Sequence, residues 1–270
     1  MSIVDLHTHS SASDGQYDPR ELVTLAKEQG IEVLALTDHD NFDGTAEAIS
    51  AGKEQNLLVL RGIEIGAREF RNLHILGYGF SAADENLNRL CEKLKNGREE
   101  RNQRIIAFLK EKGIELDLQE VKDLARGGVI GRPHFAQVMV KHGYVANNRE
   151  AFDRYLDTHE YKRIAPWKAG ARECVETLKS AGAKVSLAHP YQLGLENEKL
   201  ERLAAELKSF GLDALECYYP KHTAEQQTFY LALAEKYGLH ATGGSDFHGE
   251  KVKPDVKLAR LELDVGWLLS

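Results

Sequence analysis

The stretch IVDLHTHSSASDG, residues 3–15, decides how the chain folds, because a mostly apolar run leads directly into two histidines. A short apolar run bounded by polar residues is typical of a buried β-strand. Side chains at positions i and i+2 of a strand point to the same side, so His7 and His9 should point together. The serine, aspartate and glycine that follow are typical of a turn. We therefore expect a strand at residues 3–6 that ends in a pair of histidines facing one site.

The same alternation of apolar and amphipathic segments runs through both ends of the chain. Predicted strands lie at residues 3–6, 33–36, 57–65, 74–76, 184–188, 214–218, 240–244 and 257–263, and predicted helices lie at residues 20–29, 44–55, 174–181, 200–209 and 224–237. Nearly continuous apolar strands between helices are the pattern of a parallel sheet that is covered on both faces. About seven such β/α units favour an α/β fold with a closed or nearly closed barrel, and an open doubly wound sheet is the alternative.

The alternation stops in the middle of the chain. Residues 83–166 are mostly helical and charged in pattern, and they include the run ENLNRLCEKLKNGREE at residues 85–100. We predict that residues 1–82 and 167–270 form the barrel domain. Residues 83–166 are then a helical insertion subdomain that covers the active site.

Composition and charge argue against several classes of protein. A net charge of −7 does not suit a protein that coats duplex DNA through its phosphates. No apolar run approaches the roughly 18 residues needed to span a bilayer, and no secretion signal is evident. Cys91, Cys174 and Cys217 are too widely spaced for a disulfide framework or a CxxC metal site. We expect a cytoplasmic protein without membrane association and without an obligate protein partner.

Histidines and carboxylates gather at the ends of the predicted strands. They are His7, His9, His39, His74, His189 and His248, together with Asp14, Asp38, Glu64 and Asp246. The carboxyl ends of the strands form the active face of a barrel enzyme, so we expect these side chains to converge there. Imidazole mixed with carboxylate, without cysteine, suits Zn, Mn or Fe rather than a structural zinc held by thiolates. The residues themselves therefore predict a divalent-metal site.

Six short motifs carry a family resemblance. They are DLHTHSSASDG at residues 5–15, ALTDHD at 35–40, GIEI at 62–65, HILGYG at 74–79, AHP at 188–190 and GGSDFHG at 243–249. Together they resemble the ordered motifs of the PHP (polymerase and histidinol phosphatase) metallo-phosphoesterases, over nearly the whole chain. The resemblance implies a distorted seven-stranded β/α barrel with three divalent metal ions at its C-terminal face. Mn is the expected metal, and Zn or Fe also suits the ligands.

The resemblance also implies how the ligands are shared among the ions. His7 and His9 would hold the first ion together with Asp246 and a bridging Glu64; Glu64, His74 and His189 would hold the second; Asp14, His39 and His248 would hold the third. Many members of the family have a histidine where this chain has Asp14, and the carboxylate makes the third site harder and more selective for Mn. Glu64, Asp246 and His248 are also predicted to be catalytic, since hydrolysis would proceed by direct attack of metal-bound hydroxide.

Two further motifs point to a substrate class. GRPHFA at residues 131–136 and ECYYPKHT at 216–223 are similar to motifs of the PHP subgroup that acts on nucleotides, which includes 3′,5′-nucleoside bisphosphate phosphatases and a 5′-to-3′ exoribonuclease. The predicted function is hydrolysis of the 3′-phosphate of 3′,5′-bisphosphonucleotides to give 5′-monophosphates, together with 5′-to-3′ trimming of short RNA. The alternatives are a histidinol-phosphate phosphatase, an amidohydrolase and a non-catalytic binding module with the same fold.

Basic residues of the insertion are candidates for binding the substrate. Arg98, Arg101 and Arg104 recur every three residues, so a helix would carry them as one basic stripe, which suits a second phosphate or a solvated face. The turn at Pro133 would present Arg132 and His134 together. The predicted substrate-binding residues are Arg101, Asn102, Arg104, Arg132, His134 and Lys221, and His134 is also predicted to donate a proton to the leaving oxygen.

Overall fold

The chain forms two compact units. The computed structural model describes residues 1–125 and 128–269. Met1–Cys91 and Ala169–Ser270 make up one unit, called the barrel unit here, and Glu92–Lys168 make up the other, called the helical unit. The division of the chain into domains at residues 83 and 166 stays a prediction.

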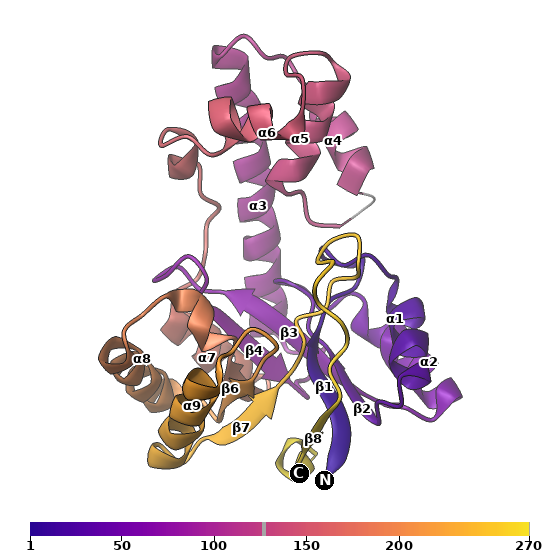
Figure 1. Cartoon of the computed structure of the whole chain (residues 1–270), viewed down its shortest axis with the longest axis vertical. Helices are drawn as coiled ribbons and strands as arrows, with labels where there is room; N and C mark the ends of the chain where they lie inside the picture. The colour runs from indigo at the N-terminus through magenta and orange to yellow at the C-terminus, as the bar shows by residue number, and fades with distance from the viewer. Residues whose placement is uncertain (126–127, 270) are drawn as a thin grey trace. The chain divides into compact units, whose positions relative to one another are not determined.

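Eight strands of the barrel unit form one sheet that nearly closes on itself (Figure 1). They are β1 (Ser2–Thr8), β2 (Val33–Leu36), β3 (Leu58–Gly66), β4 (His74–Tyr78), β5 (Lys184–Leu187), β6 (Ala214–Tyr218), β7 (His240–Gly243) and β8 (Leu261–Leu263), in the spatial order β7-β6-β5-β4-β3-β2-β1-β8. The segment after β7 returns to β1, where Phe247 forms a parallel bridge with Thr8. The α/β barrel expected from the sequence is thus confirmed.

The parallel sheet expected from the sequence also contains two strands that run antiparallel to their neighbours. β4 runs antiparallel to both β3 and β5, and β8 runs antiparallel to β1. Residues 67–73 are all that separates β3 from β4, whereas a parallel crossover needs about a dozen residues or more. The short connection therefore makes β3 and β4 a hairpin, and it brings the first residue of β4, His74, beside the end of β3.

Helices cover the outside of this sheet. They are α1 (Pro19–Glu28), α2 (Thr45–Gln55), α7 (Ala171–Ser180), α8 (Asn197–Phe210) and α9 (Ala224–Lys236). Two short 3₁₀ turns, η3 (Pro190–Leu193) and η4 (Gly266–Leu268), follow β5 and β8 in the chain. Figure 1 shows α1 and α2 beside β1 and β2, and α7, α8 and α9 along the part of the sheet from β4 to β7. Alternate residues of β2 divide between two cores: Leu34 packs with α1 and α2, and Val33 packs with residues inside the barrel. This alternation is the period of two expected of a strand.

The helical unit has a hydrophobic core of its own. It contains most of α3 (Glu85–Glu111) and all of α4 (Leu118–Ala125), α5 (Arg132–Lys141), α6 (Asn148–Ala151), the π-helix η1 (Phe152–Leu156) and the 3₁₀ turn η2 (Tyr161–Arg163). Phe135 and Met139 of α5 are fully buried there against Ile105 and Leu109 of α3. A core of this kind gives the unit a source of stability that the barrel does not supply.

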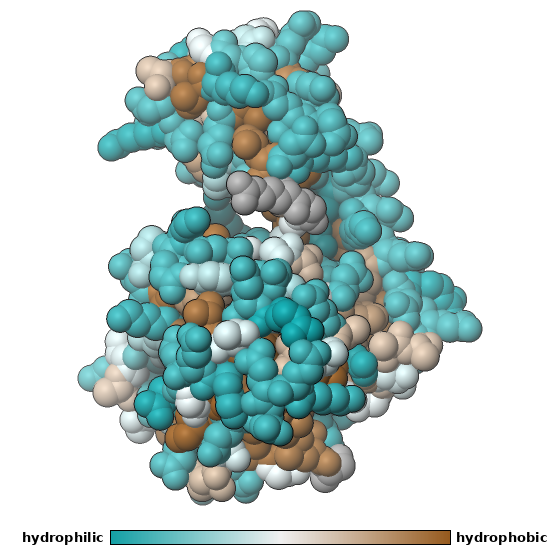
Figure 2. Space-filling view, turned by 90° about the vertical axis from the view of Figure 1, so that its right-hand side faces the viewer, coloured by the Kyte–Doolittle hydropathy of each residue, from teal (hydrophilic) through white to brown (hydrophobic). Residues whose placement is uncertain are grey.

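The face of the chain drawn in Figure 2 is largely polar. On the face drawn in Figure 2, hydrophilic side chains cover most of the surface, and hydrophobic ones show as separate groups among them. Among the described residues, no helix is both long enough and apolar enough to cross a bilayer.

Candidate metal centre

The nine predicted metal ligands all lie in the barrel unit, at or just beyond strand termini. They are His7, His9, Asp14, His39, Glu64, His74, His189, Asp246 and His248. Six of them are buried, with at most 3% of their surface exposed, and Asp14, His39 and His74 are partly exposed. Side chains that are up to 241 residues apart in the sequence thus share one site, because the carboxyl ends of parallel strands meet at one end of a barrel.

A β-bulge in β1 turns the first histidine pair toward this site. Asp5 pairs with Leu34 of β2, but Thr8 instead of His7 pairs with Leu36, so β1 contains one extra residue. Leu36 packs against the covering helices, and a His7 paired with Leu36 would face those helices too. The bulge therefore leaves His7 on the inner side with Leu6, which is the way that bulges re-aim side chains beside active sites.

Glu64 of β3 lies at the middle of the cluster. Its Oε2 atom is 3.3 Å from His7 Nε2, 3.2 Å from His9 Nε2 and 3.1 Å from His39 Nδ1. Its Oε1 atom is 2.8 Å from His74 Nδ1 and 3.0 Å from His189 Nε2. Each oxygen of this buried carboxylate thus faces its own set of imidazole nitrogens, which is the arrangement of a ligand that can bridge two ions.

Asp246 approaches the same nitrogen of His9 as Glu64 does, and its two oxygens have different contacts. Oδ1 is 3.3 Å from both His9 Nε2 and His248 Nδ1. Oδ2 accepts a hydrogen bond from Tyr219 Oη at 3.0 Å and from Lys253 Nζ at 2.7 Å. Oδ1 therefore faces the histidines of the cluster, and Oδ2 is held by the hydrogen bonds from Tyr219 and Lys253.

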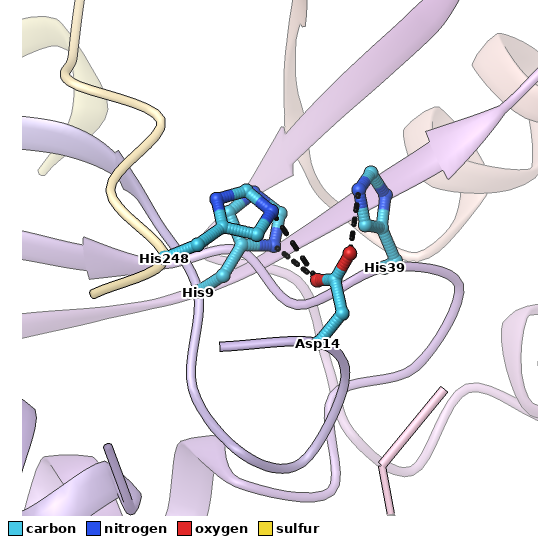
Figure 3. Close-up of side chains that lie close together, drawn as sticks. All are labelled: His9, Asp14, His39 and His248. Carbon is cyan, nitrogen blue, oxygen red and sulfur yellow. Dashed lines mark ion pairs between the residues drawn. The ribbon is translucent and has the colours of Figure 1, made fainter. Parts of the chain in front are cut away.

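Asp14 forms a third group at the more exposed edge of the cluster (Figure 3). Its Oδ1 is 3.3 Å from His248 Nε2 and 3.8 Å from His9 Nδ1, and its Oδ2 is 3.9 Å from His39 Nε2. A Cβ atom at Gly15 would collide with the carbonyl oxygen of His9, so the turn that returns Asp14 to the histidines needs a glycine there.

These distances fit divalent ions. Two ligand atoms that are each about 2.1 Å from one ion lie roughly 3.0–3.4 Å apart in octahedral or tetrahedral geometry. His7 Nε2, His9 Nε2 and Glu64 Oε2 are buried without a hydrogen-bond partner among the described residues, although the carboxylate oxygen lies 3.3 and 3.2 Å from the two nitrogens. Buried polar atoms without partners are costly. Ions between them would satisfy all three atoms.

The possible ligand groups overlap. One consists of His7, His9, Glu64 and Asp246, another of His9, Asp14, His39 and His248, and another of His39, Glu64 and His74. The first coincides with the predicted first set, and the second contains the predicted third set. His189 approaches Glu64 but lies outside these groups, so the assignment of ligands to individual ions stays a prediction.

Burial and neighbouring charges shift the pKa values of the side chains in the cluster in different directions. Burial disfavours charge on His9, but its close contacts with the carboxylates of Asp246 and Glu64 outweigh burial and raise its pKa to about 9. Burial lowers the pKa of His39 to about 4 in spite of Glu64 and Asp14. For Glu64 burial is overcome by the surrounding histidines, which hold its pKa well below the usual range. A metal ion at His9 must therefore displace a proton.

The backbone is strained at the same site. Among the described residues outside glycine, positive φ angles occur at Asp40, Asn56, His189 and Asp246, and all of these except Asn56 belong to or adjoin the cluster. His189 has φ 22° and ψ 64° at the start of η3. Such conformations persist only where the surrounding structure holds them, and they concentrate at functional sites.

Three residues that contact the predicted ligands were missed by the sequence analysis. Glu216 of β6 contacts both His7 and His189, and Tyr219 and Lys253 contact Asp246. An acidic residue inside the apolar predicted strand at residues 214–218 is the signal that could have identified Glu216. Lys253 has no comparable signal, because it lies in a polar loop.

The predicted substrate-binding residues divide between the two units. Arg101 Nη2 donates to Tyr161 Oη at 2.9 Å, and Arg104 Nη2 donates to the carbonyl oxygen of Ala165 at 2.7 Å. Arg132 pairs with Asp157 at 2.9 Å, and His134 Nδ1 accepts the backbone N–H of Gly131 at 3.0 Å. Asn102 is buried with no hydrogen-bond partner for its Oδ1 among the described residues. Lys221 belongs to the barrel unit and is exposed in the loop after β6.

Comparison with known proteins identifies the family. The PHP domain model matches residues 5–165. A 5′-3′ exoribonuclease of Haemophilus influenzae is 35% identical over 90% of this chain and 89% of its own length, and a 3′,5′-nucleoside bisphosphate phosphatase of Chromobacterium violaceum is 30% identical over 92% and 88%. A solved structure from Chromobacterium violaceum, described as an amidohydrolase with bound sulfate and no metal, is 30% identical, with a TM-score of 0.81 over 97% of this chain and 92% of that one. This chain belongs to the PHP family, as its six motifs predict.

Proposed function

We propose that the chain is a metal-dependent phosphoesterase that removes the 3′-phosphate of 3′,5′-bisphosphonucleotides and so produces 5′-monophosphates. We propose further that it trims short RNA from the 5′ end. The single observation that carries metal-dependent hydrolysis is the buried Glu64 carboxylate, whose two oxygens face five imidazole rings. The choice of nucleotides is supported by the two relatives described above, an exoribonuclease and a bisphosphate phosphatase.

The nine predicted ligands are proposed to hold three divalent ions, with Mn²⁺ preferred. Bound ions would neutralise the charge of a phosphate ester and lower the pKa of a coordinated water. Glu64 supplies an oxygen to either side of the cluster, and His248 is held between Asp14 and Asp246. Lys253 and Tyr219 fix the orientation of Asp246, so that only one of its oxygens is available to an ion.

The arginines of the helical unit are proposed to bind the second phosphate. Burial and the nearby Arg132 and Arg104 lower the pKa of Arg101, although Tyr161 opposes that shift. Asp157 pairs with Arg132, whereas the hydrogen-bond acceptors of Arg101 and Arg104, the Tyr161 hydroxyl and the Ala165 carbonyl oxygen, carry no charge. Guanidinium groups bind phosphate oxygens in pairs, and a 5′-phosphate would supply the missing anion.

His134 is proposed to protonate the leaving oxygen. Its Nδ1 accepts a hydrogen bond from the backbone of Gly131, which leaves Nε2 as the nitrogen that carries the proton of the neutral ring. A ring in this tautomer can donate from Nε2. Lys221 is proposed to contribute a further positive charge for an RNA substrate.

The arginines of the helical unit and the complete set of predicted ligands favour this function over the alternatives. A histidinol phosphate carries one phosphate and would leave the arginine cluster without an anion, and a binding module would have no need of a complete ligand set. We expect an enzyme of the cytoplasm that acts without a protein partner and does not bind duplex DNA, in keeping with its net charge of −7 and the wide spacing of its three cysteines.

A phosphate-release panel tests the proposal. Metal-stripped protein is refilled with Mn²⁺ and given 3′,5′-bisphosphoadenosine, histidinol phosphate or a 5′-phosphorylated RNA dinucleotide. We expect rapid release of phosphate from the bisphosphonucleotide, a 5′-monophosphate product, and no activity without metal. Activity on histidinol phosphate alone would overturn the substrate, and full activity of the metal-stripped protein would overturn the metal requirement.

A further inference from the structure

One buried carboxylate outside the predicted ligand set connects two of the ligand histidines. Glu216 lies on β6 and has no exposed surface. Its Oε1 is 3.0 Å from Nδ1 of His7, and its Oε2 accepts the backbone N–H of His189 at 2.6 Å. These histidines come from the ends of two other strands, β1 and β5.

The chemistry of this contact decides which nitrogen of His7 faces the cluster. A carboxylate can only accept hydrogen bonds, so Nδ1 of His7 must be the donor. The Nε2 atom of neutral His7 then presents its lone pair toward Glu64 and Asp246, at 3.3 and 3.7 Å. Partners of this kind fix the tautomer and orientation of histidine ligands.

The second contact of Glu216 holds a strained backbone. His189 has a φ angle of 22°, in a region that residues with side chains rarely adopt, and its N–H points at Glu216. Its Nε2 atom lies 3.0 Å from Oε1 of Glu64. The hydrogen bond from the His189 backbone therefore stabilises the conformation that brings this ring to Glu64.

A second buried carboxylate, Asp38, supports a different part of the cluster. It accepts hydrogen bonds from the backbone N–H of Ser10 at 2.8 Å, from the Ser10 hydroxyl at 2.7 Å and from the Ser13 hydroxyl at 2.5 Å. These serines belong to the turn that carries Asp14. Asp38 thus supports the turn that carries Asp14, whereas Glu216 contacts His7 and His189.

We propose that Glu216 is a positioning residue that prepares His7 and His189 for metal, and that it does so independently of the group around Asp14. The inference rests on the proposed metal-dependent function. Glu216 holds one histidine by its ring and the other by its backbone, so its loss weakens the ions at both histidines. The ion at Asp14, His39 and His248 keeps its support from Asp38.

The substitution Glu216→Gln tests the tautomer argument because it conserves size. The His189 N–H requires an oxygen, so the amide NH₂ of Gln would face His7 and force Nδ1 to accept. The proton of His7 would then sit on Nε2, where the metal should bind. Glu216→Ala leaves a space that water can fill with either hydrogen-bond direction. We therefore expect Gln to be at least as damaging as Ala, whereas a carboxylate that only fills space would give the opposite order.

The experiment is a Mn²⁺ titration of the metal-stripped full chain by calorimetry. We expect Glu216→Gln to lower the affinity of the affected ions about 10- to 100-fold, the range seen when partners of metal ligands are removed. Asp213→Asn is the matched control: Asp213 accepts the backbone N–H of Val185 at 2.8 Å, near the start of β5, and we expect unchanged affinity. Thermal unfolding of each metal-free variant checks that the fold is retained.

A double variant tests independence. We expect Asp14→Ala to remove one tight ion, and Glu216→Gln combined with Asp14→Ala to lose affinity at the remaining sites as well. The inference is overturned if Glu216→Gln binds Mn²⁺ as tightly as the wild-type protein does, or if Glu216→Gln lowers the affinity less than Glu216→Ala does. An unchanged chain that binds no Mn²⁺ overturns the proposed function instead.

Discussion

Metal affinity should rise steeply with pH because His9 must lose a proton to become a ligand. In the metal-free protein Asp246 and Glu64 overcome the effect of burial and raise the pKa of His9 to about 9. At pH 7 only about 1% of this ring is neutral and at pH 9 about half is, so the apparent affinity should increase about 50-fold between pH 7 and pH 9. Burial also opposes charge on His7, yet Glu216 and Glu64 raise its pKa well above 6.5 and steepen the dependence. His39 adds nothing in this range, because burial lowers its pKa to about 4.

The stability of the metal-free protein should change in the opposite direction. A histidine whose pKa is raised on folding stabilises the fold fully below its unfolded pKa, and the contribution is lost as the pH rises through the folded value. For His9 that window runs from 6.5 to about 9. At about 1.4 kcal/mol per pKa unit the contribution is about 3 kcal/mol. The melting temperatures of metal-free and metal-loaded protein should therefore diverge as the pH increases.

Two measurements test this reasoning. Mn²⁺ affinity is determined at pH 7, 8 and 9 by competition with a chelator under anaerobic conditions, and thermal unfolding is followed at the same pH values. His142→Gln is the control, because His142 pairs with Glu120 on the helical unit and lies outside the predicted ligand set. Its pH dependence should equal that of the unchanged chain. An affinity that changes less than threefold from pH 7 to pH 9 would refute the displacement of a proton from His9.

Three further predictions follow from the contacts described above. Glu64→Gln removes a charge that faces five histidines, and we expect Mn²⁺ affinity, measured by titration, and phosphate release to fall at least 100-fold, beyond the loss seen for partners of ligands. Arg101→Met removes charge-assisted hydrogen bonds worth about 1.5–3 kcal/mol, so kcat/KM for a 3′,5′-bisphosphonucleotide should fall about 10- to 150-fold, while steady-state assays with a nucleoside 3′-monophosphate should show no change. Phe135→Ala opens a cavity in the core of the helical unit and should cost about 3–5 kcal/mol in denaturant unfolding of that unit, while the Mn²⁺ affinity of the folded barrel stays the same.

Local patterns were sufficient to predict most of the barrel and to identify candidate metal ligands that the structure brings together. The strand at β2 reads directly from four consecutive apolar residues, and His39 and Glu64 belong to motifs that close or immediately follow apolar runs. The apolar run that indicates a strand and the motif that contains the candidate ligand lie within a few residues of each other in the chain. A prediction based on neighbouring residues therefore captures them.

Strand direction was not predictable in the same way. An apolar run such as β4 has the same composition whether the strand runs up or down the sheet, and only the length of the connection before it carries the direction. Residues 67–73 are too few for a crossover, so the hairpin could have been predicted from loop length. The direction of β4 also affects the candidate site. Because β4 runs antiparallel to β3, its first residue, His74, lies beside Glu64.

The bulge in β1 and the role of Glu216 depend on pairings that no local pattern encodes. The side that His7 faces depends on the register between β1 and β2, and a shift of one residue would turn the ring toward the helices. The nitrogen that His7 presents depends on Glu216, which is 209 residues away in the sequence. The motif around His7 therefore identifies a candidate ligand, whereas the orientation of its ring depends on two other strands. It follows that a grafted copy of residues 3–15 would not bind metal as this chain does unless β2 and β6 were supplied with it.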